Sequence, residues 1–378
     1  MIPLSVPNLS GNEWKYIKEC LDTNWVSSVG SYVNLFEKTV ADFCDVKAAI
    51  AISNGTLALH ISLLLSGVRQ GDLVILPNIT FVAPANVIKY LGADPVLIDA
   101  DETTWQIDLD ILENFLVTQT IIKEHQTIHK ETRRRVAAIL PVHVLGNICD
   151  MDRLLGLAEK YQLVIVEDAT EALGSYYRGK HAGTFGKFGC LSFNGNKIIT
   201  TGGGGMVLCN DVELGKKIKH LTTQAKADAD EYYHDEIGYN YRLVNILAAM
   251  GVAQMEQLPQ FLKRKREIRA RYDEFFSQIN GAAQQKITEN VQSNNWLYTV
   301  RLPQQQELRK YLLVNKIDVR PFWVPMNRLP AFEKDIYIHV DDVAGRIYDN
   351  CLSLPCSTSL TEEEQNTVLR LLKEFYYD

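Results

Sequence analysis

Short apolar runs alternate with helical stretches over residues 48–208, and this alternation constrains the fold more than any other feature of the chain. Strands and helices that alternate at this spacing form parallel sheets with crossover helices. The sequence therefore predicts an α/β fold in which a mostly parallel central sheet carries helices on both faces. The apolar runs are Ala48–Ile52, Leu73–Leu76, Pro95–Ile98, Val136–Leu140, Leu163–Val166 and Gly189–Phe193.

The helical pattern lengthens near residue 250, where we predict a boundary between two domains. Residues 1–250 would form a large α/β domain with an N-terminal arm. Residues 251–378 would form a smaller C-terminal α+β domain, entered through a long helical segment that begins at Asn245. A chain of this length suits about two or three domains.

Local patterns predict several elements of the smaller domain. Trp296–Leu302 and Ile317–Val319 are expected strands, and the acidic residues of Thr361–Glu364 are typical of the first turn of a helix. Pro259 lies within the long helical segment and is expected to kink or divide it.

The stretch 118–135 is polar and interrupts the alternation, so we predict a surface insertion. It contains His125, His129 and the basic run Arg133–Arg135. Two histidines four residues apart can bind a metal from one helical face, but no zinc-binding motif accompanies them, and solvated polar residues are the favoured interpretation. The basic run is likewise expected to be solvated rather than to clamp a nucleotide.

Composition argues against nucleic acid and membrane partners. The formal net charge of -7 gives no general attraction for either, so a phosphate group would need a local site. No apolar run approaches the ~18 residues of a membrane span, and the N-terminus lacks the pattern of a signal peptide. The seven cysteines include no Cys-x-x-Cys pair, which argues against disulfides and a zinc site. We expect a cytoplasmic protein that binds small molecules and no metal.

Lys197 lies between an apolar strand and the glycine run Gly202–Gly205, and Ser192 precedes it by five residues. A lysine in this position suits a Schiff base, and the hydroxyl group and the glycines suit a nearby phosphate. This layout points to pyridoxal phosphate. The alternative is a surface lysine at the end of a strand, before a flexible loop.

Asp168 follows the apolar run that ends at Val166 and offers a partner for such a cofactor. In open α/β sheets, ligands bind at the carboxyl ends of the strands. A carboxylate there would keep the pyridine nitrogen protonated, which lets the cofactor accept electrons from a carbanion. The alternative is a helix N-cap.

Two further segments follow expected strands. Asn54, Gly55 and Thr56 begin an apolar helix, whose free N–H groups and positive dipole end suit a phosphate. A simple cap is the alternative. Phe81 could stack on the cofactor ring, although a lone aromatic residue is more often part of the core.

Together these segments resemble the DegT/DnrJ/EryC1/StrS family of sugar aminotransferases over nearly the whole chain. The resemblance implies a fold type I enzyme that uses pyridoxal phosphate and acts on nucleotide-linked 4-ketosugars. The segments that carry it are Ser53–Thr56, Thr80–Val82, Glu167–Gly174, Ser192–Gly205, Gly238–Arg242 and Gly251–Glu256.

The resemblance also implies individual roles. Lys197 would bind the cofactor covalently and then move protons, while Asp168 would pair with the pyridine nitrogen. Asn240 would reach the phosphate in the neighbouring subunit, so the active unit would be a homodimer with shared sites. The remaining cofactor contacts would be Asn54 and Gly55 at the helix start, Thr56 and Ser192 on the phosphate, Phe81 near the ring face and Glu171 near the ring hydroxyl.

Within the family, the likeness is greatest to the aminotransferases that make UDP-N-acetylbacillosamine or supply legionaminic acid synthesis. It rests on Phe193–Thr201, Thr223–Ala225 and Asn295–Leu297, with Arg320–Trp323. The implied reaction moves an amino group from L-glutamate to C4 of UDP-2-acetamido-4-keto-2,4,6-trideoxyglucose. GDP-4-keto-6-deoxymannose is an alternative acceptor.

Candidate substrate contacts are Arg242, Arg320 and Trp323. Asn327 stands where relatives usually have a histidine that is thought to help hold the nucleotide sugar, which weakens the substrate assignment but not the cofactor assignment.

Two other functions would use the same fold. Sugar dehydratases replace the cofactor lysine with histidine, so Lys197 argues against that activity. A non-catalytic regulator that binds pyridoxal phosphate would normally carry a DNA-binding module, for which the chain has neither spare length nor a basic face.

Overall fold

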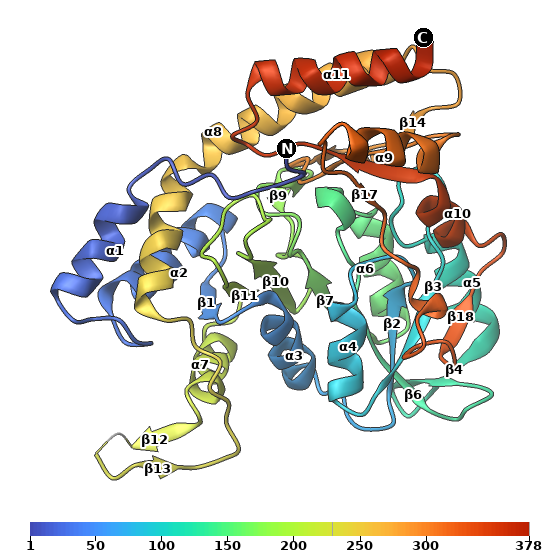
Figure 1. Cartoon of the computed structure of the whole chain (residues 1–378). Helices are drawn as coiled ribbons and strands as arrows, with labels where there is room; N and C mark the ends of the chain where they lie inside the picture. Colours follow the sequence, from blue (N-terminus) through green and yellow to red (C-terminus); the bar gives the residue numbers. More distant parts are fainter. Residues whose placement is uncertain (229, 378) are drawn as a thin grey trace.

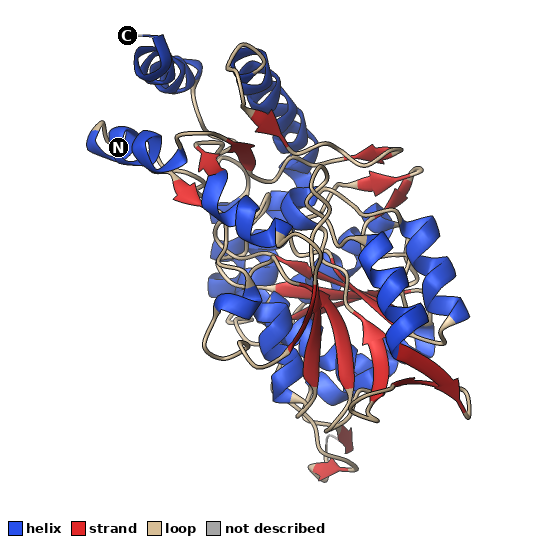
Figure 2. Cartoon of the chain, turned by 90° about the vertical axis from the view of Figure 1, so that its right-hand side faces the viewer, coloured by secondary structure: helices blue, strands red, loops and turns tan. Residues whose placement is uncertain are grey.

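The computed structural model describes residues 1–228 and 230–377, and a ten-stranded mixed sheet forms its centre (Figure 1). The main strand order is β1-β11-β10-β7-β6-β2-β3-β18. Helices lie on both sides of this sheet (Figure 2), which confirms the predicted α/β class. The strands are β1 (Ala48–Ile52), β2 (Leu73–Pro77), β3 (Asp94–Ile98), β6 (Arg135–Ile139), β7 (Val164–Asp168), β10 (Phe188–Ser192), β11 (Gly205–Cys209) and β18 (Ile336–Ile338).

The sheet is parallel from β10 to β18, and β11 runs antiparallel between β1 and β10. Parallel strands are covered on both faces and therefore read as nearly continuous apolar runs, as β2 does with every residue buried. The apolar runs located six of these strands. They did not locate β11, whose first residue belongs to the glycine run.

The helices of the large domain include the crossover connections between strands. α1 and α2 pack against the first part of α8. No helix in the described part of the chain has both the length and the apolar composition to cross a membrane. The bounds are α1 (Glu13–Asp22), α2 (Ser31–Cys44), α3 (Gly55–Leu65), α4 (Ala83–Tyr90), α5 (Leu109–Gln119), α6 (Met151–Lys160), α7 (Val212–Thr222) and α8 (Asn245–Phe276), with a short 3-10 turn η1 (Val144–Gly146).

A second hydrophobic core lies in the C-terminal part of the chain. A four-stranded sheet in the order β14-β16-β19-β17 packs there with α9 and α11. The elements are β14 (Ala283–Gln284), β16 (Tyr298–Arg301), α9 (Gln305–Val314), β17 (Arg320–Pro321), η2 (Met326–Arg328), α10 (Val343–Asn350), β19 (Cys351–Leu354) and α11 (Glu362–Tyr377). The predicted last helix is therefore present. The expected strand Ile317–Val319 is not, because Ile317 forms only an isolated bridge with Ile2 and the strand β17 begins at Arg320.

The predicted boundary at residue 250 falls inside α8, and this helix joins both cores. Val252 and Leu258 belong to the larger core, whereas Ile268 and Tyr272 belong to the smaller one. β18, which the boundary assigns to the smaller domain, instead pairs with β3 at the edge of the large sheet. The chain therefore passes between the two cores more than once.

Pro259 does not divide α8, which runs unbroken for 32 residues. Proline removes one helical hydrogen bond and crowds the preceding turn. Here its side chain is exposed, while Met255, Leu258 and Phe261 are buried in the larger core. Packing on both sides of the proline therefore outweighs its local cost.

The polar stretch 118–135 is a hairpin of β4 (Thr120–Lys123) and β5 (Gln126–His129), and β5 pairs with the start of β6. The expectation of a solvated insertion is wrong at three residues. His129 is buried, and Arg134 and Arg135 form ion pairs with Asp94 and Asp72. Pairing with β6 draws these polar groups onto the sheet.

The remaining short strands form two small sheets at the surface. One hairpin, β12 (Lys226–Asp228) with β13 (Tyr233–His234), projects from the body of the molecule beyond α7 (Figure 1). The other sheet contains β8 (Tyr176–Tyr177), β9 (Lys180–His181) and β15 (Val291–Gln292), and it links the two parts of the chain.

Candidate active site

The carboxyl ends of four large-domain strands meet at one edge of the sheet, where the structure has a cavity of about 350 Å³. The register places Ile52 at the end of β1 and Ser192 at the end of β10 beside Gly205, the first residue of β11. β7 and β2 end at the same edge, because they run parallel to β10. The volume suits a small cofactor or substrate.

The cavity collects most of the residues that the sequence predicted. Asn240, Arg242 and Arg320 are not among its lining residues. The predicted residues that line it are Asn54, Gly55, Thr56, Phe81, Asp168, Glu171, Ser192, Lys197 and Trp323.

The N-terminus of α3 forms one wall of the cavity. Asn54 caps the helix, and its Oδ1 accepts a hydrogen bond from Leu57 N at 2.9 Å. The first N–H groups of a helix have no partner within it, so those of Gly55 and Thr56 are suited to an anion. A Cβ atom on Gly55 would lie 2.9 Å from Cβ of Ser192, so glycine lets the helix end approach the serine hydroxyl.

Asp168 lines the cavity and is 3% exposed. Its Oδ1 accepts a hydrogen bond from Thr170 N at 3.0 Å. No helix begins here, so Asp168 is not the helix N-cap that its sequence context also allowed. In the described part of the chain no cationic side chain forms an ion pair with Asp168, and burial raises the pKa of its carboxyl group. A ligand with a protonated nitrogen would compensate this buried charge, which fits the pyridine ring of pyridoxal phosphate.

Lys197 is not a surface lysine, because only 14% of its side chain is exposed. Its Nζ lies 4.0 Å from Oε1 of Glu171, whose Oε2 accepts a hydrogen bond from Leu145 N at 2.8 Å. Burial lowers the pKa of Lys197 and raises the pKa of Glu171 to about 7. A lysine with a lowered pKa has more of its amine in the neutral, nucleophilic form. Lys197 is therefore suited to attack a carbonyl group.

Trp296 also lines the cavity, although it was not among the predicted site residues. The centre of its indole ring is 4.1 Å from Nζ of Lys197, and its Nε1 donates to the carbonyl oxygen of Asn196 at 2.7 Å. Its ring stacks on that of Trp323, with centroids 6.3 Å apart. Trp296 comes from the C-terminal part of the chain, and no local spacing connects it to Lys197.

Arg242 lies outside the cavity and has a structural partner. It is buried, and its Nη1 donates to Oε1 of Glu37 at 2.7 Å and to the carbonyl oxygen of Ala51 at 3.1 Å. This buried ion pair uses the guanidinium group that was predicted to contact substrate.

The other two residues outside the cavity are more accessible. Arg320 is exposed and lines an adjoining cavity of about 160 Å³, together with Trp296 and Trp323. Asn240 is exposed on the segment that follows the β12–β13 hairpin. Neither residue contacts the main cavity within this chain.

Asn327 forms two hydrogen bonds with Asn78, the residue that directly follows β2. Asn78 Nδ2 donates to Asn327 Oδ1 at 2.9 Å, and Asn327 N donates to Asn78 Oδ1 at 3.0 Å. The asparagine therefore joins η2 to the end of β2. Its amide group is used in this contact.

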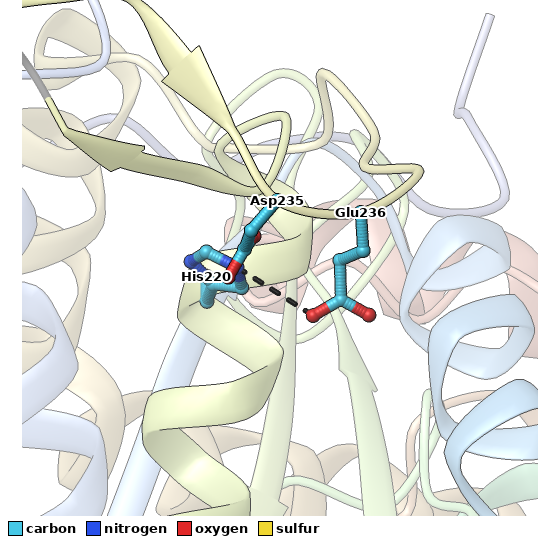
Figure 3. A group of neighbouring side chains, drawn as sticks. All are labelled: His220, Asp235 and Glu236. Atoms are coloured by element: carbon cyan, nitrogen blue, oxygen red, sulfur yellow. Dashed lines mark hydrogen bonds and ion pairs between the residues drawn. The ribbon is translucent and has the colours of Figure 1, made fainter.

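A cluster of possible metal ligands lies apart from the cavity, where the hairpin meets α7 (Figure 3). His220 Nε2 is 2.7 Å from Asp235 Oδ1 and 3.6 Å from Glu236 Oε1. Lys217 also pairs with Glu236. These groups already satisfy one another, and their contacts tie the base of the hairpin to α7.

Comparisons with known proteins match almost the whole chain. The model of the DegT/DnrJ/EryC1/StrS aminotransferase family matches residues 7–373. The GDP-perosamine synthase of Escherichia coli O157:H7 is 38% identical over 100% of this chain and 99% of its own length. The GDP-perosamine synthase of Caulobacter vibrioides is 37% identical over 99% of this chain and 98% of its own. The putative sugar aminotransferase Spr1654 from Streptococcus pneumoniae, in its PLP-form, superposes with a TM-score of 0.88 at 26% identity, covering 99% and 98% of the two chains.

Proposed function

The chain belongs to the DegT/DnrJ/EryC1/StrS aminotransferase family, and we propose that it transfers an amino group from L-glutamate to C4 of GDP-4-keto-6-deoxymannose. The family makes it a sugar aminotransferase whose cofactor is pyridoxal phosphate. The identity of the sugar and of its nucleotide is the proposal. The observation that carries the proposal is full-length similarity to two GDP-perosamine synthases.

This proposal replaces the acceptor that the sequence favoured. The likeness to UDP-N-acetylbacillosamine and legionaminic acid enzymes rested on short segments around the lysine and in the C-terminal domain. The relatives match over 99% or more of the chain. Similarity over the whole chain rests on many more residues than those short segments do. UDP-2-acetamido-4-keto-2,4,6-trideoxyglucose is kept as the second candidate.

When bound, pyridoxal phosphate supplies a carbonyl carbon that accepts an amino group and a ring that delocalises negative charge. The N-terminus of α3, with Thr56 and Ser192, would hold the phosphate by N–H and hydroxyl donors. Asp168 would hold a proton at the pyridine nitrogen. Phe81 is 54% exposed at the cavity mouth and would cover one face of the ring.

Lys197 would carry the proton in each half of the reaction. In the first half its Nζ would move the α-proton of glutamate to the cofactor carbon, and in the second half it would move a proton from that carbon to C4 of the sugar. Glu171 lies 4.0 Å from this nitrogen and has a pKa of about 7, so it can exchange a proton with the amine near neutral pH. Trp296 and Glu171 together would keep the free amine inside the cavity.

A substrate panel tests the acceptor. We expect the purified enzyme with L-glutamate to convert GDP-4-keto-6-deoxymannose at least about tenfold faster, as kcat/KM, than UDP- or dTDP-linked 4-ketosugars. Product mass and release of 2-oxoglutarate report the transfer. Preference for the UDP-linked acetamido sugar would reject the GDP proposal in favour of the second candidate, and conversion of the dTDP sugar alone would reject both.

We further propose that the enzyme is a homodimer with shared active sites. Asn240 is exposed and is not among the residues that line the cavity of its own chain, so contact with a phosphate would come from another copy. Tyr232 and Ile237, in and beside the projecting hairpin, are 75% and 86% exposed, and large apolar side chains at such exposure are typical of a protein interface. The partner's hairpin region would bring Asn240 to the phosphate.

Mixed dimers test the shared site. Lys197→Ala and Asn240→Ala are each expected to lower activity strongly when expressed alone. When the two chains are expressed together, one site of each mixed dimer has both native residues, and activity should recover to about a quarter of the parent value. A mixture no more active than its components would contradict the shared site. Light scattering on the parent protein measures the oligomer independently.

A further inference from the structure

Trp296 lies against the amine of Lys197, and it belongs to a segment of the C-terminal domain, residues 293–297, that we call the strap. The indole ring centre is 4.1 Å from Lys197 Nζ, and the indole N–H donates to the carbonyl oxygen of Asn196. Trp296 is 3% exposed. One side chain therefore contacts both the lysine amine and the residue before it.

Asn294 docks the strap onto the loop that carries Glu171. Its Nδ2 donates to the carbonyl oxygens of Glu171 and Leu173 at 2.8 and 2.9 Å, while its Oδ1 accepts from Trp296 N at 2.9 Å. A Cβ atom on Gly146 would lie 1.8 Å from this Oδ1, and Gly146 has a φ of +82°, so glycine is required on both grounds. Asn294 therefore fixes the strap to the large domain.

Lys265 of α8 binds the backbone of the strap. Its Nζ donates to the carbonyl oxygen of Trp296 at 2.6 Å and to that of Cys356 at 2.5 Å. Lys265 is 3% exposed and, among the described residues, has no carboxylate within ion-pair distance. Burying an ammonium group against carbonyl oxygens alone is costly. A methionine would fill a similar volume without that cost, so packing does not account for a lysine here.

We propose that Lys265 is a positioning residue that fixes Trp296 over the amine of Lys197 and thereby favours the protonated form of that amine. The inference rests on the proposed role of Lys197 as the amine that binds the cofactor. An aromatic face attracts a cation, so an indole ring held at this place stabilises the charged amine. If the strap loosens, that stabilisation is lost.

Other ionisable groups near the two lysines could also change the protonation of the Lys197 amine. Asp168 and Glu171, from the end of β7 and the loop after it, are the other ionisable residues that line the cavity with Lys197. Lys265 faces Arg269 on α8, Tyr298 on β16 and the thiol of Cys356. Substitution of Lys265 removes a positive charge, which by itself would favour protonation of Lys197. Positioning and direct electrostatics therefore predict opposite signs.

The test compares Lys265→Met and Trp296→Leu with the control Lys263→Met, which changes a lysine of the same helix whose side chain is 74% exposed. The readout is the pH midpoint of the visible absorption of pyridoxal phosphate bound to each protein, which reports protonation of the same Lys197 nitrogen once it is joined to the cofactor. We expect Lys265→Met and Trp296→Leu to move the midpoint to lower pH by about 0.5–1 unit, and the double variant to move it no further. Lys263→Met should leave it unchanged.

A shift to higher pH, or no shift, in Lys265→Met would overturn the proposal. Melting temperatures check that each variant folds. If Lys265→Met does not fold, Lys265→Gln keeps an amide donor for the carbonyl oxygens and should give a smaller shift of the same sign; an unmoved midpoint would again overturn the proposal. A parent protein that gains no visible absorption with pyridoxal phosphate would instead reject the role of Lys197.

Discussion

Replacing Lys197 by alanine is expected to lower turnover by about 10⁴-fold, because the amine both binds the cofactor and carries the proton in each half reaction. No other residue that lines the cavity could replace this amine. Among its lining residues Lys197 is the only one with a basic side chain, and Glu171 is held 4.0 Å from it by a hydrogen bond to Leu145 N. Steady-state formation of 2-oxoglutarate measures the loss.

The same variant should keep its affinity for pyridoxamine phosphate, since the α3 N-terminus, Ser192 and Asp168 do not depend on the lysine. Equilibrium dialysis measures this binding. Lys187→Ala is a matched control, because Lys187 is exposed just before β10, at the end of the strand away from the cavity. Turnover within tenfold of the parent in Lys197→Ala, or loss of pyridoxamine phosphate binding, would contradict the assigned roles.

Much of this arrangement was predictable because it is local in the sequence. Each of Asn54, Asp168 and Ser192 ends or follows an apolar strand, and the carboxyl ends of parallel strands meet at one edge of a sheet. Locating the strands in the sequence is therefore enough to predict that these side chains lie close together. Glu171 follows Asp168 so closely that the same strand carries both to the cavity.

The rest depends on contacts between distant segments, which local pattern does not encode. Trp296 reaches Lys197 only because the strap crosses from the smaller domain. Arg242 was a candidate substrate contact, and only the fold shows that Glu37 of α2 forms an ion pair with it. His129 looked solvated because its neighbours are polar, yet pairing of β5 with β6 buries it.

The two hydrophobic cores illustrate the same limit at the level of domains. Helical periodicity identified α8 but not the change of core along its length. A short strand such as β18 carries too little signal to show that it returns to the large sheet. The strap and β18 both lie in the part assigned to the smaller domain, and both act on the larger one. Residues from both sides of the predicted boundary therefore line the active site.

Replacing Asp168 by asparagine is expected to lower turnover by about 10²–10³-fold and to stabilise the cofactor-free protein at neutral pH. Burial raises the pKa of Asp168 above its ordinary value. For a group whose pKa is raised on folding, the stabilising contribution is complete below the pKa of the unfolded chain and is lost as pH rises through the folded value. At pH 7 the charged carboxylate therefore destabilises the empty cavity, and an asparagine removes that effect.

The melting temperature of cofactor-free Asp168→Asn should exceed that of the parent by about 1–3 °C at pH 7 and match it at acidic pH, where both side chains are neutral. With pyridoxal phosphate bound, the parent should instead have the higher melting temperature, because only the carboxylate pairs with a protonated pyridine nitrogen. Asp108→Asn is the matched control: burial also raises the pKa of Asp108, which caps α5 away from the cavity, and asparagine keeps the cap. That variant should keep parent activity. Equal stabilisation of Asp168→Asn with and without the cofactor would show that Asp168 does not face the pyridine nitrogen.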